Sequence, residues 1–167
     1  MPSAAAMSME SSTINLACFE VKGQAYAIDI SYVLEIVRFM PISPLPNAPA
    51  LIEGVIDLRG AVIPVVDLVK VLNRGHADTG SNGRIVVLEV EGLVLGLQVD
   101  AATDVLSFDT QQLEDVPDLA THAGYDAVRN VVRRPNETPI MVLAVEALIE
   151  NIYRSALPVA AARREVG

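Results

Sequence analysis

Histidine, the side chain most often used in acid–base and metal chemistry, occurs only twice in this chain of 167 residues. The one segment where possible metal ligands gather contains Asp115, Asp118, His122 and Asp126. The spacing of these side chains matches no common ligand pattern, and Pro117 and Gly124 interrupt the segment. We therefore interpret it as a solvated acidic loop, and we expect neither a metal nor a cofactor.

The tetrapeptide Asp78-Thr79-Gly80-Ser81 is similar to the sequence around the carboxylate of an aspartic protease. That chemistry requires a pair of aspartates that share one proton, each presented from an apolar strand. Here the tetrapeptide follows the polar segment 73–76, and the chain holds no second copy of it. A small all-β acid protease that uses Asp78 would therefore have to be a dimer, and we keep it as an alternative hypothesis.

Cys18 is the only cysteine, so the chain cannot form an internal disulfide, which favours a reducing compartment such as the cytoplasm. The residues around it alternate between apolar and polar, as in a half-buried strand. Cys18 shares the parity of Glu20 and Lys22 in this pattern. We therefore expect a partly exposed thiol with no redox role.

A constellation suited to binding occurs around Arg59. The alternation along residues 56–59 places Asp57 and Arg59 on one face of a strand, and Gly60 follows as a turn residue. A guanidinium at a hairpin tip can reach a carboxylate, and Glu35 is the candidate partner. An ordinary exposed arginine at a turn would show the same pattern, so the residue types alone do not decide between the two interpretations.

Charge and composition exclude several classes of protein. Hydrophobic residues make up 51% of the chain, which excludes intrinsic disorder, but there is no Trp, so the core must consist largely of aliphatic side chains. The net charge of −9 disfavours nucleic acid and anionic membranes as main partners. No apolar run approaches the roughly 18 residues of a membrane span. We expect a soluble protein whose N-terminal residues 1–13 form a loose tail.

Short strands dominate the predicted secondary structure, with a proline-rich extended segment at 41–49 and a loop at 73–83. Helix is expected only in short pieces: one turn capped by Ser31, one turn after Asp67, a segment between Thr110 and Asp118, and residues 144–153.

The strand pattern occurs twice. Residues 19–23 align without a gap with residues 88–92, and this alignment places Ile28 on Leu97 and Glu35 on Asp104. Residues 63–68 match residues 140–145 near the end of each half. We infer an internal duplication of about seventy residues and expect two small β barrels side by side. A cleft between them could hold a small ligand, which is a further alternative function.

Three runs of residues together resemble the CheW-type chemotaxis coupling proteins. They are residues 26–36, from Tyr26 to Ile36; residues 47–68, with Gly54-Val55-Ile56-Asp57-Leu58-Arg59-Gly60 at their centre; and residues 99–106, from Val99 to Leu106. The resemblance covers roughly residues 14–150.

The resemblance implies an all-β fold of two intertwined five-stranded barrels, similar to Src-homology-3 barrels and related by a pseudo-two-fold axis. The first barrel would span about 14–72 and the second about 84–150, with exchange of strands between them, and residues 151–167 would form the end of a short C-terminal helix and a tail. It also implies a non-enzymatic, cytoplasmic adaptor that is recruited to receptor arrays at the inner membrane. Its partners would be the cytoplasmic tip of a chemoreceptor and the regulatory domain of a CheA-type histidine kinase.

The same resemblance implies which residues contact partners. Arg59, with Gly54 and Gly60 in the same motif, and Glu35 would form the functional centre. A receptor helical hairpin would pack against Val33, Ile36, Val99 and Val105 in a groove between the barrels. The loop that carries Phe39, Met40, Ile42 and Leu45 would face the kinase domain.

The chain departs from the family pattern in its second half. Residues 128–135 are cationic and end in Pro135 where an apolar stretch with glycine is usual, and Ala101 replaces a frequent glycine. From Ile85 to Val128 there are nine acidic residues and no Lys or Arg. We infer a changed choice of partner through the second half.

Overall fold

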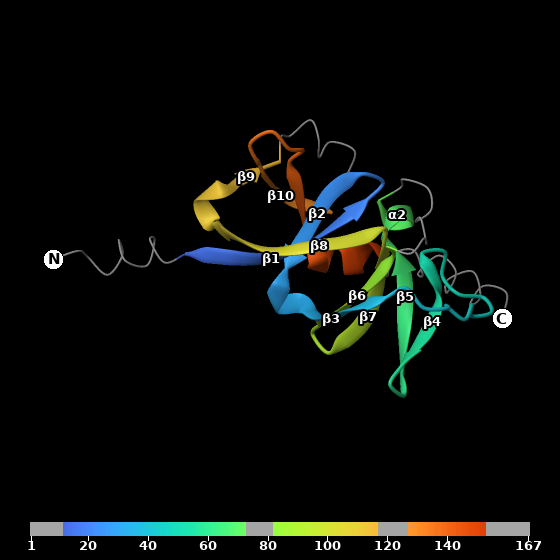
Figure 1. Ribbon diagram of the computed structural model, residues 1–167. Coiled ribbons are helices and arrows are strands. Elements are labelled where there is room, and N and C mark those ends of the chain that lie inside the picture. The colour runs from blue at the N-terminus through green and yellow to red at the C-terminus, as the bar shows by residue number, and fades with distance from the viewer. Residues whose placement is uncertain (1–11, 73–81, 117–126, 153–167) are drawn as a thin grey trace.

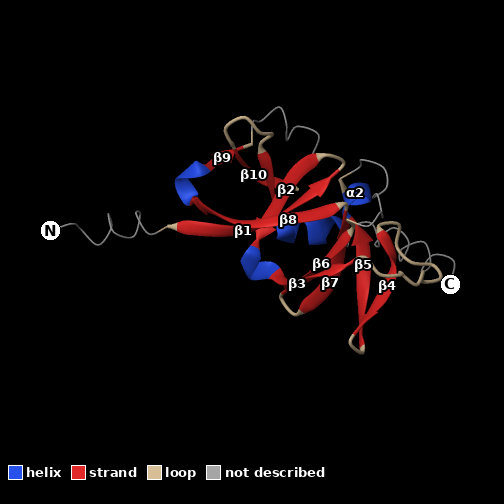
Figure 2. Ribbon diagram, in the orientation of Figure 1, coloured by secondary structure: helices blue, strands red, loops and turns tan. Residues whose placement is uncertain are grey.

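The computed structural model describes residues 12–72, 82–116 and 127–152, and most of these lie in strands (Figure 2). The elements of the first half are β1 (Thr13–Val21), β2 (Gln24–Asp29), η1 (Ile30–Tyr32), β3 (Val33–Arg38), β4 (Ile52–Leu58), β5 (Ala61–Asp67) and α2 (Leu68–Val71). Those of the second half are β6 (Arg84–Val90), β7 (Leu93–Val99), β8 (Ala101–Asp109), η2 (Thr110–Gln112), β9 (Leu113–Asp115), β10 (Val128–Val132) and β11 (Ile140–Leu143). Residues 145–152 are also helical.

The strands form two sheets that exchange hairpins between the halves of the chain (Figure 1). One sheet has six strands in the order β8-β1-β2-β11-β10-β9, and the other has five in the order β3-β6-β7-β5-β4. The β1–β2 hairpin thus belongs to a sheet otherwise built from the second half, and the β6–β7 hairpin belongs to the sheet of the first half. The expected all-β class is confirmed, although one sheet has six strands instead of five because the chain returns as β9.

Strand registers show the duplication in detail. Phe19 pairs with Ala102 and Ala17 with Val105, with a bulge between the pairs. In the other sheet Leu88 pairs with Val33 and Val86 with Ile36, again with a bulge between them. A shift of 69 positions converts the first set into the second. Asp104 therefore occupies in the six-stranded sheet the position that Glu35 occupies in the five-stranded sheet.

In each sheet, short connections bring the two edge strands toward each other. In the six-stranded sheet the edges are β8 and β9, which are joined by the short turn η2 alone. In the five-stranded sheet the edges are β3 and β4, and the segment after β3 bridges back to β4 through Ser43 and Val55. Curling of this kind gives each sheet an interior that side chains fill.

Three apolar clusters form the core. The largest lies between the sheets and includes Phe19, Ile28, Leu88 and Leu97. A second fills the interior of the six-stranded sheet, with Leu16, Cys18, Ala27, Val132, Ile140 and Val142. A third fills the five-stranded sheet, with Ile56, Ile63, Val65, Ile85 and Val87. Strands that lie between two clusters are buried on both faces, so their sequences lack a clear polar face.

Cys18 illustrates this double burial, and the expectation of a partly exposed thiol is wrong. Ala17, Phe19 and Val21 face the cluster between the sheets, whereas Cys18 faces the interior of its own sheet and is 5% exposed. Burial raises the pKa of the Cys18 thiol from 9.0 to about 11. Arg134 opposes this rise in pKa, and Asp104 adds to it.

The short helical elements begin at aspartates. The Asp29 side chain accepts a hydrogen bond from the Ser31 backbone N–H, so the expected helix cap is Asp29 and not Ser31. Asp67 caps α2 in the same manner, and α2 is the helical turn that was expected after Asp67. Of the described residues 110–116, Thr110–Gln112 alone are helical, and β9 follows where more helix was expected. Within the described ranges no helix is both long and apolar enough to cross a membrane.

Candidate functional site

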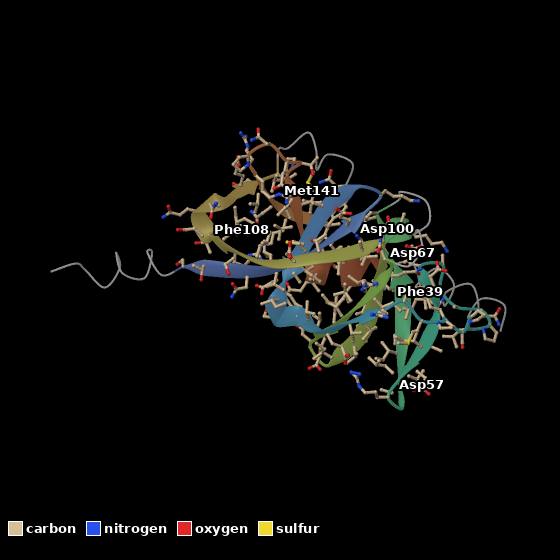
Figure 3. The ribbon with its side chains drawn as sticks, viewed as in Figure 1. Phe39, Asp57, Asp67, Asp100, Phe108 and Met141 are labelled. Carbon is tan, nitrogen blue, oxygen red and sulfur yellow. The ribbon has the colours of Figure 1, made fainter. Side chains whose placement is uncertain are left out.

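The turn between β4 and β5 holds Arg59 in an unusual backbone conformation. Leu58 pairs with Ala61, which leaves Arg59 and Gly60 as a two-residue turn with φ values of 50° and 87°. Positive φ at both positions defines the type I′ hairpin, and Gly60 suits it because glycine has no Cβ. The Gly60 backbone N–H donates to Asp57 Oδ1 over 2.9 Å and fixes the turn. Asp57 marks the outer tip of this hairpin in Figure 3.

The Arg59 guanidinium reaches back to the Glu35 carboxylate on β3, and the two form an ion pair through Nη2 and Oε2. The Arg59 side chain is 68% exposed, and that of Glu35 is 35% exposed. Exposed pairs of this kind contribute only about 0–1 kcal/mol to folding stability. The pair therefore orients a guanidinium at the surface more than it holds the fold together. The sequence-based pairing of these residues matches this contact.

Exposed apolar side chains surround this pair along the chain. Ile36 follows Glu35 and is 36% exposed, and Leu34 precedes it and is 53% exposed. Val62, on the same hairpin as Arg59, is 70% exposed. Leu34 and Val62 were not among the predicted contacts. Val62 lies in a continuous apolar run, where alternation cannot separate exposed from buried residues.

The remaining residues expected to meet a receptor differ in their accessibility. Val105 lies on edge strand β8 and is 57% exposed, and Val33 on β3 is half-buried. Val99 is 0% exposed and packs in the cluster between the sheets. Val99 is therefore a core residue, and the expectation that it contacts a partner does not hold in this structure. Its strand, β7, lies inside its sheet and supplies alternate side chains to that cluster.

The loop expected to face a kinase domain runs from β3 toward β4. Met40 and Ile42 pack partly on the interior cluster of the five-stranded sheet. Leu45 is 46% exposed, and Phe39, which is labelled in Figure 3, is half-buried. The Phe39 backbone N–H donates to the Gly83 carbonyl over 3.2 Å, which anchors the start of the loop. The loop thus presents Leu45 outward and uses Met40 and Ile42 as anchors.

Gly54 positions this loop instead of offering a contact surface. It is buried, and a Cβ at this residue would lie 2.2 Å from the Ser43 carbonyl oxygen and 2.8 Å from Ile42 Cγ2. Only glycine allows the loop backbone to lie this close to β4. Next to this close approach, Ser43 and Val55 exchange two backbone hydrogen bonds of 2.8 and 2.9 Å.

The cationic segment of the second half is largely neutralised by local contacts. Arg133 Nε lies 2.9 Å from Glu114 Oε2, and Arg134 Nη1 lies 3.3 Å from Glu137 Oε2. Arg129 is exposed on β10 and has no ion pair within the described part of the chain.

A hydrogen bond links η1 to the C-terminal helix. The Tyr32 hydroxyl donates to Glu146 Oε1 over 2.8 Å, and this hydrogen bond raises the pKa of the Tyr32 phenol.

The candidates for catalysis and metal binding fall mostly outside the described residues. Asp78, Asp118, His122 and Asp126 all lie there, and Asp115 alone is described, as an exposed residue of β9. Among residues 12–72, 82–116 and 127–152, no three His, Cys, Asp or Glu side chains gather closely enough to hold a metal ion.

Two interlocked β sheets with a charged, exposed hairpin define a binding module of the all-β class. A family model described as the CheW-like domain matches residues 15–152. The chain therefore belongs to the CheW-like family.

Individual relatives agree with this assignment. The chain is 37% identical over 117 residues to the chemotaxis protein CheW of Rhizobium meliloti, which covers 70% of this chain and 76% of that protein. It is 30% identical over 143 residues to the protein FrzA of Myxococcus xanthus, which covers 84% and 88%. The crystal structure of the scaffolding protein TtCheW from Thermoanaerobacter tengcongensis matches with a TM-score of 0.72 at 31% identity, over 81% of this chain and 86% of that one.

Proposed function

We propose that this protein is a non-enzymatic adaptor that couples chemoreceptors to a CheA-type histidine kinase in chemosensory signalling. Family membership over residues 15–152 supports the role, as does the likeness to a scaffolding protein over most of the chain. The observation that carries the proposal is the Arg59–Glu35 pair, in which an exposed guanidinium is fixed on a rigid hairpin. An adaptor acts through the geometry of such surfaces and needs no turnover.

In this proposal the cytoplasmic tip of the receptor docks at the Arg59–Glu35 pair. Ile36 and Val105 stand at equivalent positions of the two repeats, and both are exposed on edge strands. They would supply apolar contacts to a helical hairpin, while Val33 and Gly60 would line the same surface. Arg59 would add a charge-assisted hydrogen bond that sets the orientation of the helices.

The kinase regulatory domain would bind the loop from Phe39 to Leu45. Leu45 is an exposed large hydrophobic residue of this loop, and Phe39 is half-buried. Met40 and Ile42 anchor the loop by packing on the interior cluster of the five-stranded sheet. Leu45 could therefore bind a partner without rearrangement of the loop. Binding to both partners at once would place the protein in receptor arrays at the inner membrane.

The second half would adjust the choice of partner. Arg133 and Arg134 are engaged by Glu114 and Glu137, which leaves Arg129 as the exposed cation of β10. If residues 129–134 tune specificity, replacing them by a small apolar stretch should change the preference among kinase or receptor partners. An unchanged preference would remove this part of the proposal.

Isothermal titration calorimetry tests the assignment of the surfaces. The protein is titrated with the CheA-type regulatory domain of the same organism, and separately with the cytoplasmic hairpin of a receptor. We expect Leu45→Asp to weaken binding of the regulatory domain only, and Arg59→Glu to weaken binding of the receptor only. Lys22→Glu is the matched control, because Lys22 occupies the same position of a two-residue turn in the β1–β2 hairpin, with a φ of 50°. Equal loss of both partners in either variant would contradict the assignment.

A further inference from the structure

A cavity of about 400 Å³ opens beside the interior cluster of the six-stranded sheet. Its apolar wall consists of Cys18, Ala25 and Ile140. The other side chains that matter to its chemistry are polar: Glu20, Thr103, Asp104, Arg134, Glu137 and Thr138. The receptor and kinase surfaces proposed above contain none of these residues.

The internal duplication shows how the six-stranded sheet leaves room for this cavity. A shift of 69 positions places Val87 at the position of Cys18 and Val94 at the position of Ala25. Val87 is buried in the cluster of the five-stranded sheet, and Val94 packs against that cluster. Two smaller side chains in the six-stranded sheet thus leave space that valines fill in its counterpart.

The same comparison shows that Asp104, unlike its counterpart Glu35, has no arginine paired with it in the described part of the chain. Asp104 occupies the position of Glu35, but within the described residues it forms no ion pair, whereas Glu35 pairs with Arg59. The arginine of the cavity wall, Arg134, has other partners. It bonds to Glu137 through Nη1, and its Nη2 donates to the Thr138 carbonyl over 2.9 Å.

The charges of the cavity lining and one unpaired hydrogen-bond donor define which chemical groups the cavity could bind. The cavity lining carries three carboxylates, those of Glu20, Asp104 and Glu137, and one guanidinium, so its net negative charge attracts a cation. Arg134 Nε is buried and has no hydrogen-bond acceptor among the described residues. A complete occupant must therefore bring a positive charge for Asp104 and an oxygen acceptor for Arg134.

We propose that this cavity receives an arginine side chain from a partner protein, whose guanidinium pairs with Asp104 as Arg59 pairs with Glu35. The peptide group of that arginine would supply the acceptor for Arg134 Nε. The wall contains no aromatic residue and is mostly polar, unlike the apolar pockets that enclose free small molecules. A single charged side chain of a partner protein, held in place by a larger interface, suits such a wall better than a free small molecule does.

Nuclear magnetic resonance titration of the full-length protein tests the proposal with N-acetyl-L-arginine amide as the probe. We expect saturable shifts at the backbone amides of Ala25, Thr103 and Asp104. N-acetyl-L-glutamine amide, which is similar in length but uncharged, should bind at least about tenfold more weakly. Equal binding of the two probes would overturn the proposal. Free L-arginine that binds at least about tenfold more tightly than the amide would also overturn it, because the site would then select a metabolite.

Variants locate the binding. Asp104→Asn should weaken the arginine probe at least about fivefold, whereas Glu35→Gln, at the equivalent position, should leave it unchanged. Ala25→Val, which copies Val94, should close the cavity and abolish the shifts. If Ala25→Val does not fold, the Asp104→Asn result decides alone, and undiminished binding in that variant refutes the proposal. Because neither receptor nor kinase enters this titration, its outcome is independent of the adaptor role.

Discussion

Arg59 and Glu35 form an ion pair between the two edges of the five-stranded sheet. Glu35 lies on β3 at one edge of the sheet, and Arg59 follows β4 at the other edge. Their contact therefore depends on the curling of the whole sheet and not on neighbouring strands. The arrangement makes the orientation of an exposed guanidinium depend on the shape of the sheet. A partner that binds Arg59 therefore also depends on the correct fold of the sheet.

Stability and partner binding should respond differently when Arg59 is replaced. Asparagine adopts positive φ more readily than arginine, so Arg59→Asn should leave the free energy of unfolding unchanged or raise it by up to about 1 kcal/mol. The same variant lacks the guanidinium and should lose binding of the receptor hairpin. Urea denaturation and calorimetry check the two parts. A variant that unfolds more easily by more than about 1 kcal/mol would show that the pair is structural.

A double-mutant cycle measures the ion pair itself. Arg59→Gln and Glu35→Gln, separately and together, should give a coupling energy of about 0.2–1 kcal/mol in urea unfolding, because both side chains are substantially exposed. The coupling should decrease as salt is added. A salt-independent coupling above about 2 kcal/mol would contradict the view that the pair serves recognition more than stability.

Gly54→Ala should displace the loop from Phe39 to Leu45. The added Cβ would meet the Ser43 carbonyl at 2.2 Å, so the loop must shift, and we expect a loss of about 1–3 kcal/mol in the free energy of unfolding. Binding of the kinase regulatory domain should weaken in parallel. Gly60→Ala is the control: no heavy atom lies within 4 Å of its Cβ, and only the left-handed turn opposes the change, at a cost of about 1 kcal/mol. Unaltered kinase binding in Gly54→Ala would argue against the loop as the kinase surface.

Burial of Cys18 predicts a specific dependence on pH. The folded pKa of about 11 exceeds the value of 9.0 for an exposed thiol, so the folded state retains its proton when the unfolded state has lost it. The contribution is complete below pH 9 and is lost as the pH rises toward 11, amounting to at most about 3 kcal/mol. Comparison with Cys18→Ala isolates this effect from other groups that titrate in the same range. A difference between the two proteins that stays constant from pH 8 to pH 11 would contradict it.

Thiol reactivity provides a second measurement of the same burial. The native protein at pH 8 should react slowly with a disulfide reagent, and the denatured protein should react fast.

Local patterns in the sequence were sufficient for the duplication and the hairpin turns, whereas the Arg59–Glu35 pair was only one of two interpretations until the family resemblance favoured it. The turn residues of each hairpin lie beside each other in the chain, and the repeat could be aligned without gaps through residues 19–36 and 88–105. The exchange of hairpins between the sheets and the return of the chain as β9 depend on long-range packing, which no local pattern contains.

Cys18 and Val99 show the physical limit of such predictions. Alternation indicates which residues share a face, but it does not indicate what covers that face. β1 has a cluster on each side, so Cys18 is buried on the face that Glu20 shares. Val99 ends β7 within the cluster between the sheets, at the end of a run of buried residues from Leu95 onward. Both errors arise because one strand contributes to two cores.

The most direct test of the adaptor role is receptor-controlled phosphorylation by the kinase in a reconstituted mixture. Receptor-containing membranes, the CheA-type kinase and this protein are combined, and kinase autophosphorylation is measured with and without the attractant. We predict that control of the kinase by the receptor requires the wild-type protein, is retained by Lys22→Glu and is lost in Arg59→Glu, while Arg59→Glu still binds the isolated regulatory domain. Control of the kinase by the receptor that is as strong with Arg59→Glu as with the wild-type protein would contradict the central claim.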